Sequence, residues 1–157
     1  MIVLMVLVCD TIEETIDYLM KAGEKGRRCK VTVLYRPFCA QALIDAIPDT
    51  VKKISVLDRT KEPGAMGEPL YLDVVAALKG SKFDAVPIYT GRYGLGSKDT
   101  TPAQIVAVYH NDEKQKFTLG IEDDVTHLSL KLTSRLSQHR KERSTVNSGD
   151  LELTVLL

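Results

Sequence analysis

The strongest constraint on the fold is a regular alternation of short, apolar, β-branched runs with segments whose apolar residues recur at helical spacing. The runs expected to form strands are Ile2–Val8, Lys30–Tyr35, Lys53–Leu57, Val86–Thr90 and Phe117–Ile121. Continuous apolar strands are typical of a sheet that is covered on both faces. The pattern therefore predicts an α/β fold of three layers, in which a doubly wound, mostly parallel sheet of five strands lies between helices.

Capping residues and prolines mark the expected helix ends. Asp10 or Thr11 is expected to cap the first helix, because either side chain can accept a hydrogen bond from a first-turn amide. Pro69 suits the first turn of a later helix, and Thr101 followed by Pro102 is a typical helix start.

Charge balance and cysteine usage narrow the functional class. Lys and Arg number 21, as do Asp and Glu, so nothing favours a nucleic-acid partner. The apolar start MIVLMVLV is shorter than the ~20 residues of a membrane helix, so no membrane partner is expected. Cys9, Cys29 and Cys39 are too few for a four-cysteine iron–sulfur cluster and fit reduced thiols, which predicts a cytoplasmic protein.

The chain changes character near residue 130. Residues 1–130 carry the alternating pattern and are expected to form one domain. Residues 131–157 form a tail that is first polar and then apolar at LELTVLL, which could add an edge strand to the sheet. A strand at the very first residues indicates a segment of a longer protein.

The segment Val56–Leu78 leads from a strand, through a charged loop rich in proline and glycine, into a helix. Such residues restrict the loop to a defined shape, and shaped loops on a rigid scaffold often carry function. In an open parallel sheet, ligands bind beyond the carboxyl ends of the strands. The loops expected at that edge hold the cations Arg36, Arg59, Lys61, Arg92 and Lys98.

The glycine-rich segment Gly91–Lys98 has the strand–loop–helix context of a phosphate-binding loop. Its Gly96-Ser97-Lys98 end reverses the G-K-[ST] order, and its glycines do not fit GxGxxG. An anion at the next helix N-terminus is one alternative. The other is a loop that docks against protein.

No catalytic residue and no metal ligand are assigned from the pattern. Asp123, Asp124 and His127 lack a fixed ligand geometry, and solvated loop charges explain them. Cys9 and Cys39 lie at strand-to-helix junctions, but no histidine is close to either in sequence.

Three long segments resemble the pyruvate:ferredoxin (flavodoxin) oxidoreductases. They are residues 34–80, which include DRTKEPGAMGEPLYLDV, residues 91–109 and residues 117–130. The similarity covers about residues 2–130 and is to the second domain of that family, which resembles the C-terminal domain of transketolases. Where the family usually has Gly-Ser, this chain has Val6-Leu7, and from Thr133 onward the likeness ends.

The resemblance implies part of a multidomain enzyme that oxidatively decarboxylates pyruvate to acetyl-CoA and reduces ferredoxin or flavodoxin. It implies thiamine diphosphate, Mg²⁺, iron–sulfur clusters and CoA for the whole enzyme, with none of them bound by this chain. The remaining domains of that enzyme are the implied partners.

Two functions stay open. In the first, the chain is a structural and docking domain that is inactive alone. The residues expected at its interface or on the approach of CoA are Arg59, Lys61, Glu62, Glu68, Arg92 and Lys98. In the alternative, it is a free-standing domain that binds a small molecule or an anion such as phosphate or CoA at Gly91–Lys98.

Overall fold

The fold is a single parallel sheet between two layers of helices. A computed structural model describes residues 1–5, 8–23, 28–32, 36–132 and 154–156. The strands are β1 Ile2–Met5, β2 Arg28–Thr32, β3 Ile54–Asp58, β4 Ile88–Arg92, β5 Lys116–Thr118 and β6 Thr154–Leu156. Their order is β5-β4-β3-β1-β2-β6, and every neighbouring pair is parallel.

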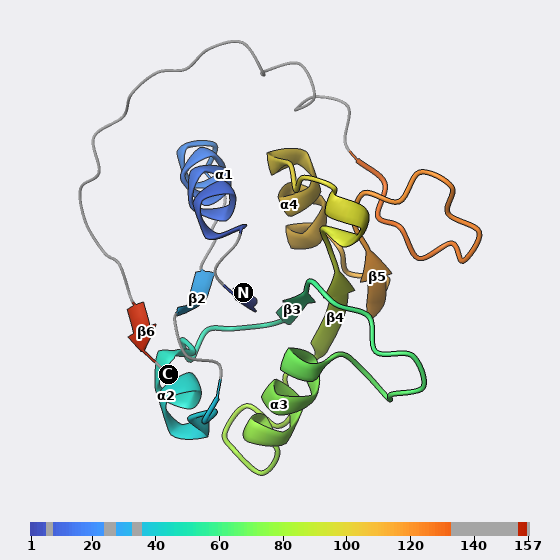
Figure 1. Cartoon of the computed structure of the whole chain (residues 1–157). Coiled ribbons are helices and arrows are strands. Elements are labelled where there is room, and N and C mark those ends of the chain that lie inside the picture. Colours follow the sequence, from blue (N-terminus) through green and yellow to red (C-terminus); the bar gives the residue numbers. More distant parts are fainter. Residues whose placement is uncertain (6–7, 24–27, 33–35, 133–153, 157) are drawn as a thin grey trace.

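Helices cover both faces of this sheet (Figure 1). They are α1 Cys9–Lys21, α2 Ala40–Ala46, α3 Pro69–Leu78 and α4 Pro102–Tyr109, with a short 3₁₀ helix η2 at Leu95–Ser97. The pair α1 and α4 lies on one face, and the pair α2 and α3 lies on the other. The α/β class and the doubly wound arrangement predicted from the sequence are confirmed.

Successive residues of the inner strands enter two separate cores. In β1, Ile2 and Leu4 pack with α1 and α4, whereas Val3 packs with α2 and α3. In β3, Leu57 packs with α1 and α4, and Val56 packs with α2 and α3. All five side chains are at most 1% exposed, which explains why these strands are apolar without alternation.

The strands differ from the sequence prediction in number and in position. The sheet has six strands instead of five, because Thr154–Leu156 pairs with β2 as an edge strand. The fourth strand was expected to end at Thr90 but continues to Arg92, since Leu57 and Asp58 of β3 pair with Gly91 and Arg92. The carboxyl end of the sheet therefore includes two residues that were assigned to a loop.

The starts of α3 and α4, where a proline follows the N-cap, were predicted correctly. Pro69 is in the first turn of α3, and the Thr101 side chain accepts from the Gln104 amide at the start of α4. The prediction for α1 was wrong: the helix begins at Cys9, its N-cap is Val8, and Asp10 lies inside the first turn. A carboxylate there still faces the positive end of the helix dipole.

Parts of the chain that carry sequence predictions lie outside the described residues. These are Val6-Leu7 and the polar part of the tail, residues 133–153. Within the part that the structure describes, no helix has the length and apolar character needed to cross a membrane.

Candidate functional site

Asp58 ends β3 at the carboxyl edge of the sheet and is completely buried. Its two carboxylate oxygens accept hydrogen bonds from the amides of Leu70 and Tyr71, each at 3.1 Å. These amides belong to the first turn of α3, where backbone donors have no partner within the helix. The Asp58 side chain therefore fills the N-terminus of α3 from a position twelve residues away in sequence.

Burial raises the pKa of Asp58 above its usual range. The two amide hydrogen bonds act in the opposite direction, because they stabilise the carboxylate. The nearby negative charges of Glu68 and Asp73 add to the increase. At this edge of the sheet, the carboxylates of Glu68 and Asp73 therefore disfavour ionisation of Asp58.

A buried ion pair joins the end of the loop to the end of β4. Arg92 Nε donates to Glu68 Oε1, and the Glu68 side chain is only 1% exposed. The second oxygen, Oε2, has no partner among the described residues. Arg92 lies opposite Asp58 in the β3–β4 register, so both acids are held at one point of the sheet edge.

Residues 59–67 form a loop that extends away from the sheet between β3 and α3 (Figure 1). A turn closes its tip, because the Ala65 amide donates to the Glu62 carbonyl at 3.2 Å and Gly64 adopts a φ of +85°. At the end of the loop, Gly67 packs under Tyr71: a Cβ at Gly67 would lie 2.5 Å from the ring. The loop therefore has a defined path from base to tip.

The second loop of this edge, residues 93–101, packs against the first. Arg59 Nε donates to the Gly94 carbonyl at 3.3 Å, and Gly94 adopts a left-handed φ of +61°. Tyr93 is buried, and its hydroxyl donates to the Met5 carbonyl at 3.4 Å. Burial raises the pKa of the Tyr93 hydroxyl, while the charge of Arg59 opposes that increase.

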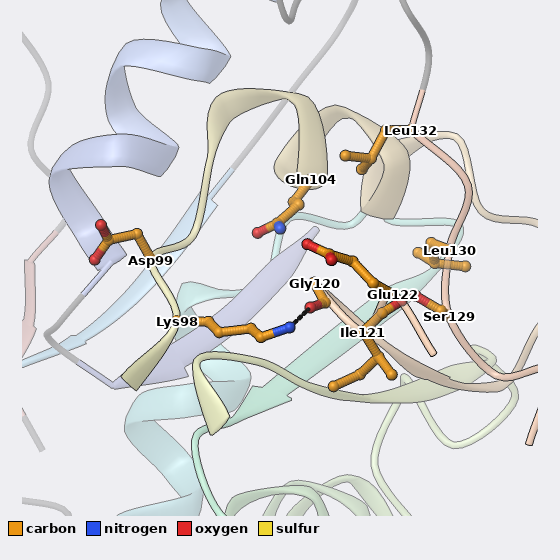
Figure 2. A pocket seen from close by; sticks show the side chains of 9 residues that line it. All are labelled: Lys98, Asp99, Gln104, Gly120, Ile121, Glu122, Ser129, Leu130 and Leu132. Atoms are coloured by element: carbon orange, nitrogen blue, oxygen red, sulfur yellow. Dashed lines mark hydrogen bonds between the residues drawn. The ribbon is translucent and has the colours of Figure 1, made fainter. Parts of the chain in front are cut away.

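Lys98 is directed across a shallow cavity of about 370 Å³ (Figure 2). Its amino group donates to the Gly120 carbonyl at 2.9 Å. Gln104, Glu122 and Leu130 also line this cavity. One cation that is already bonded to a backbone carbonyl, beside a carboxylate, does not form a phosphate cradle.

The structure divides the six predicted interface residues into two groups. Arg59, Lys61, Glu62 and Lys98 are exposed at the surface. Glu68 and Arg92 instead pair with each other below it. The sequence pattern did not single out Asp58 as a structural residue. A signal was present: an acid at the end of a strand, followed by a helix that starts with proline and has no capping side chain of its own.

The described residues offer no set of side chains that fits a metal ion or a cluster. No group of three or more His, Cys, Asp or Glu residues converges within the described ranges. Cys9 is buried and Cys39 is exposed. Asp124 is engaged in its own loop, where it accepts from the Ser129 and Leu128 amides and the Thr126 hydroxyl.

These hydrogen bonds also explain the acidity of Asp124. Partial desolvation would raise its pKa, but the hydrogen bonds from its loop and the charge of Lys114 outweigh that effect and hold the pKa below its usual range. Asp124 is thus a loop-shaping residue.

The N-termini of α3 and α4 are both occupied by side chains of the chain itself. Asp58 accepts from α3, and Thr101 accepts from α4 in a capping box with Gln104. Free backbone amides at a helix N-terminus are what attracts a phosphate. At both helix starts, part of the backbone donors that a phosphate would use is therefore already bonded to a side chain of the chain itself.

The comparisons with known proteins agree on one family. The family described as pyruvate:ferredoxin oxidoreductase core domain II matches residues 1–105. A pyruvate-flavodoxin oxidoreductase of Nostoc sp. is 53% identical over 133 residues, which cover 82% of this chain and 33% of that protein. A pyruvate:ferredoxin oxidoreductase of Moorella thermoacetica is 47% identical over 137 residues, covering 85% of this chain and 12% of that protein.

A probable pyruvate-flavodoxin oxidoreductase of Escherichia coli is 44% identical over 160 aligned residues, covering 96% of this chain and 13% of that protein. This chain thus spans between about an eighth and a third of the length of these relatives.

Proposed function

Because the chain belongs to the pyruvate:ferredoxin oxidoreductase family as its core domain II, we propose that it is a structural and docking domain of such an enzyme and is inactive alone. The enzyme would oxidatively decarboxylate pyruvate to acetyl-CoA and pass the electrons to ferredoxin or flavodoxin in the cytoplasm. The observation that carries the proposal is the small share of each relative that the chain spans, at 44–53% identity.

The donor sets of the described residues support placing the cofactors elsewhere. Thiamine diphosphate with Mg²⁺ needs oxygen ligands and a pyrophosphate site, and iron–sulfur clusters need grouped thiolates. The described residues contain no such metal-binding group, and the starts of α3 and α4 are capped by Asp58 and Thr101. This supports the proposal that these cofactors, and the reacting part of CoA, are bound by other domains of such an enzyme.

The docking role is supported by the construction of the carboxyl edge. Two buried acids, Asp58 and Glu68, fix the two ends of the 59–67 loop by hydrogen bonds to α3 and to Arg92. The loop then presents Arg59, Lys61 and Glu62 at the surface. A preorganised charged face loses little conformational freedom when a partner domain covers it.

The basic residues of this face also suit an approach path for CoA. Arg59, Lys61 and Lys98 would attract the CoA phosphates by charge, with Arg able to make bidentate contacts. Lys98 already donates to Gly120, so it would act mainly as a positive charge. Direct binding of an anion by the isolated domain is the alternative function, and the capped helix starts give it less support.

The docking proposal is tested in a chimera. Residues 1–130 of this chain would replace the matching segment of the Moorella thermoacetica protein, to which the chain is 47% identical. Pyruvate oxidation dependent on CoA and ferredoxin should be retained by the chimera and absent from the 157-residue chain. Turnover by the chain alone, or a chimera that folds but holds the segment as a freely mobile domain, would refute the proposal.

A thermal-shift screen of the isolated chain separates the two functions. A ligand that binds only the native state adds about 2.7 kcal/mol to the free energy of unfolding at a hundred times its Kd. It must therefore raise the melting temperature. A screen with phosphate, nucleotides and CoA that raises the melting temperature favours the anion-binding domain. No shift with any of them favours the docking domain.

A further inference from the structure

We propose that Met66 is the apolar anchor of the docking face and inserts into an apolar socket on a neighbouring domain of the full-length protein. This inference rests on the proposed docking function and adds the contact on which that docking depends. Met66 follows the Glu62–Ala65 turn of the 59–67 loop and is 92% exposed, more than any other large apolar side chain among the described residues.

Met66 is a large apolar side chain on a loop that otherwise exposes mainly charged and small residues. Arg59, Lys61 and Glu62 are exposed on the same loop, and Gly64 and Ala65, which precede Met66, are small and exposed. An apolar centre within a polar rim is the usual arrangement of a protein–protein contact, and Met is enriched at such centres. Its unbranched, polarisable side chain adapts well to a partner's pocket.

The backbone on both sides of Met66 is held in place. The Ala65 amide bonds to Glu62, and Gly67 is buried under Tyr71 with no room for a Cβ. The next residue, Glu68, is fixed by Arg92. An exposed methionine on a mobile segment would lose backbone entropy on docking, whereas this one is presented on a shaped loop.

The small share of the relatives that this chain spans points to a neighbouring domain as the partner that Met66 contacts. The chain covers 12% of the Moorella thermoacetica protein and 33% of the Nostoc protein, so most of each relative lies outside the matched region. We therefore take a neighbouring domain of the same protein as the partner. Because it would be covalently linked to this chain, its effective concentration near Met66 would be high. A separate protein and a second copy of the chain are outcomes that the test distinguishes.

Methionine oxidation measures this contact directly, and the chain supplies its own control. Hydrogen peroxide transfers one oxygen to an exposed thioether and leaves water, at a rate that follows exposure of the sulfur. Met20 on α1 is 56% exposed and is not part of the loop. The two rates would be compared by mass spectrometry in the 157-residue chain and in the Moorella thermoacetica chimera.

In the chimera, Met66 should oxidise about five-fold or more slowly than in the chain alone, while Met20 changes by less than about two-fold. An unchanged Met66 rate in an active chimera would overturn this inference and leave the docking function standing. An inactive chimera with a mobile segment would overturn both. Protection of Met66 in the isolated chain that rises with protein concentration would indicate a second copy and would also overturn the inference.

A pair of matched variants provides a second readout. Met66→Lys and Met20→Lys should each leave the urea midpoint of the isolated chain essentially unchanged, because both side chains are exposed. In the chimera, Met66→Lys alone should lower pyruvate oxidation about ten-fold or more, since burying an unpaired ammonium is strongly unfavourable. Equal activity of the two variants would contradict the anchor role.

The Moorella thermoacetica protein keeps the inference testable if the chimera does not fold. Hydrogen-exchange protection factors of its segment aligned with residues 62–67 should exceed those of the same loop in the isolated chain by about ten-fold. Equal protection would refute the anchor, because the loop would then be as accessible in the full-length protein as in the free domain.

Discussion

Removal of the guanidinium from the buried Glu68–Arg92 pair should be the most destabilising single change at the sheet edge. Arg92→Met keeps a side chain of similar reach but leaves the Glu68 carboxylate 1% exposed and without the donor that Arg92 supplies. Breaking a buried pair from one side costs about 3–5 kcal/mol, because the remaining charge is desolvated and uncompensated. For a chain of this size, that corresponds to a fall in melting temperature of roughly 6–20 °C.

Two further variants locate the source of this loss. Glu68→Met should cost less than Arg92→Met, because the Arg92 side chain is 17% exposed and can reach water once unpaired. The double variant Glu68→Met/Arg92→Met should recover most of the stability, since replacing a buried ion pair by apolar residues is often neutral. The coupling energy from this cycle should exceed about 2 kcal/mol.

Urea unfolding followed by far-UV circular dichroism measures all four proteins. The midpoint should shift while the slope of the free energy against urea stays constant, which shows that stability changed and not the extent of unfolding. A loss below about 1 kcal/mol for Arg92→Met would mean that the pair behaves like an exposed ion pair, and the reasoning would fail. A double variant no more stable than Arg92→Met would refute it as well.

Three further predictions concern the same edge. Gly91→Ala should cost about 1–3 kcal/mol in urea unfolding, because the new Cβ would lie 2.4 Å from the Phe117 ring in the core; no loss would show that the ring can move aside. The stability advantage of the wild type over Asp58→Asn should shrink as pH rises from about 4, because burial raises the folded pKa of Asp58 above its unfolded value and ionisation therefore costs stability; a pH-independent difference would contradict this. Thr101→Ala should cost about 0.5–2 kcal/mol by loss of the α4 cap, measured as a lower melting temperature; an unchanged value would mean that water replaces the cap.

Features that depend on neighbouring residues were predictable from the sequence. The Thr101-Pro102 start of α4 and Pro69 at the start of α3 follow from capping and proline geometry, and both are confirmed. The alternation of apolar runs also predicted the layers of the fold, because a run that is apolar on both sides must be covered on both faces. The start of α1 was missed, since no side chain caps it and Val8 carries no signal of its own.

Features that depend on sheet register were not predictable. Arg92 and Glu68 are 24 residues apart, and Asp58 and the amides it accepts are separated by a whole loop. The fourth strand was ended at Thr90 because its apolar run stops there, yet pairing with β3 extends it to Arg92. Composition of the loop identified the right edge of the sheet but gave no means to separate its buried acids from its exposed charges.

Burial of the Asp58 and Glu68 carboxylates carries a desolvation cost, so a gain in stability does not explain why these two acids are buried. Well-packed apolar residues at Asp58 and Glu68 would avoid the desolvation of two carboxylates at one sheet edge. Apolar side chains, however, would not fix direction: Asp58 orients α3 through two amides, and Glu68 ties the loop end to Arg92. The two acids therefore set the position of the 59–67 loop relative to the sheet. If that loop docks a neighbouring domain, the stability lost to burial is offset by the smaller entropy cost of docking a preformed surface. Variants such as Arg92→Met should then weaken docking in the chimera even at temperatures where the isolated chain stays folded.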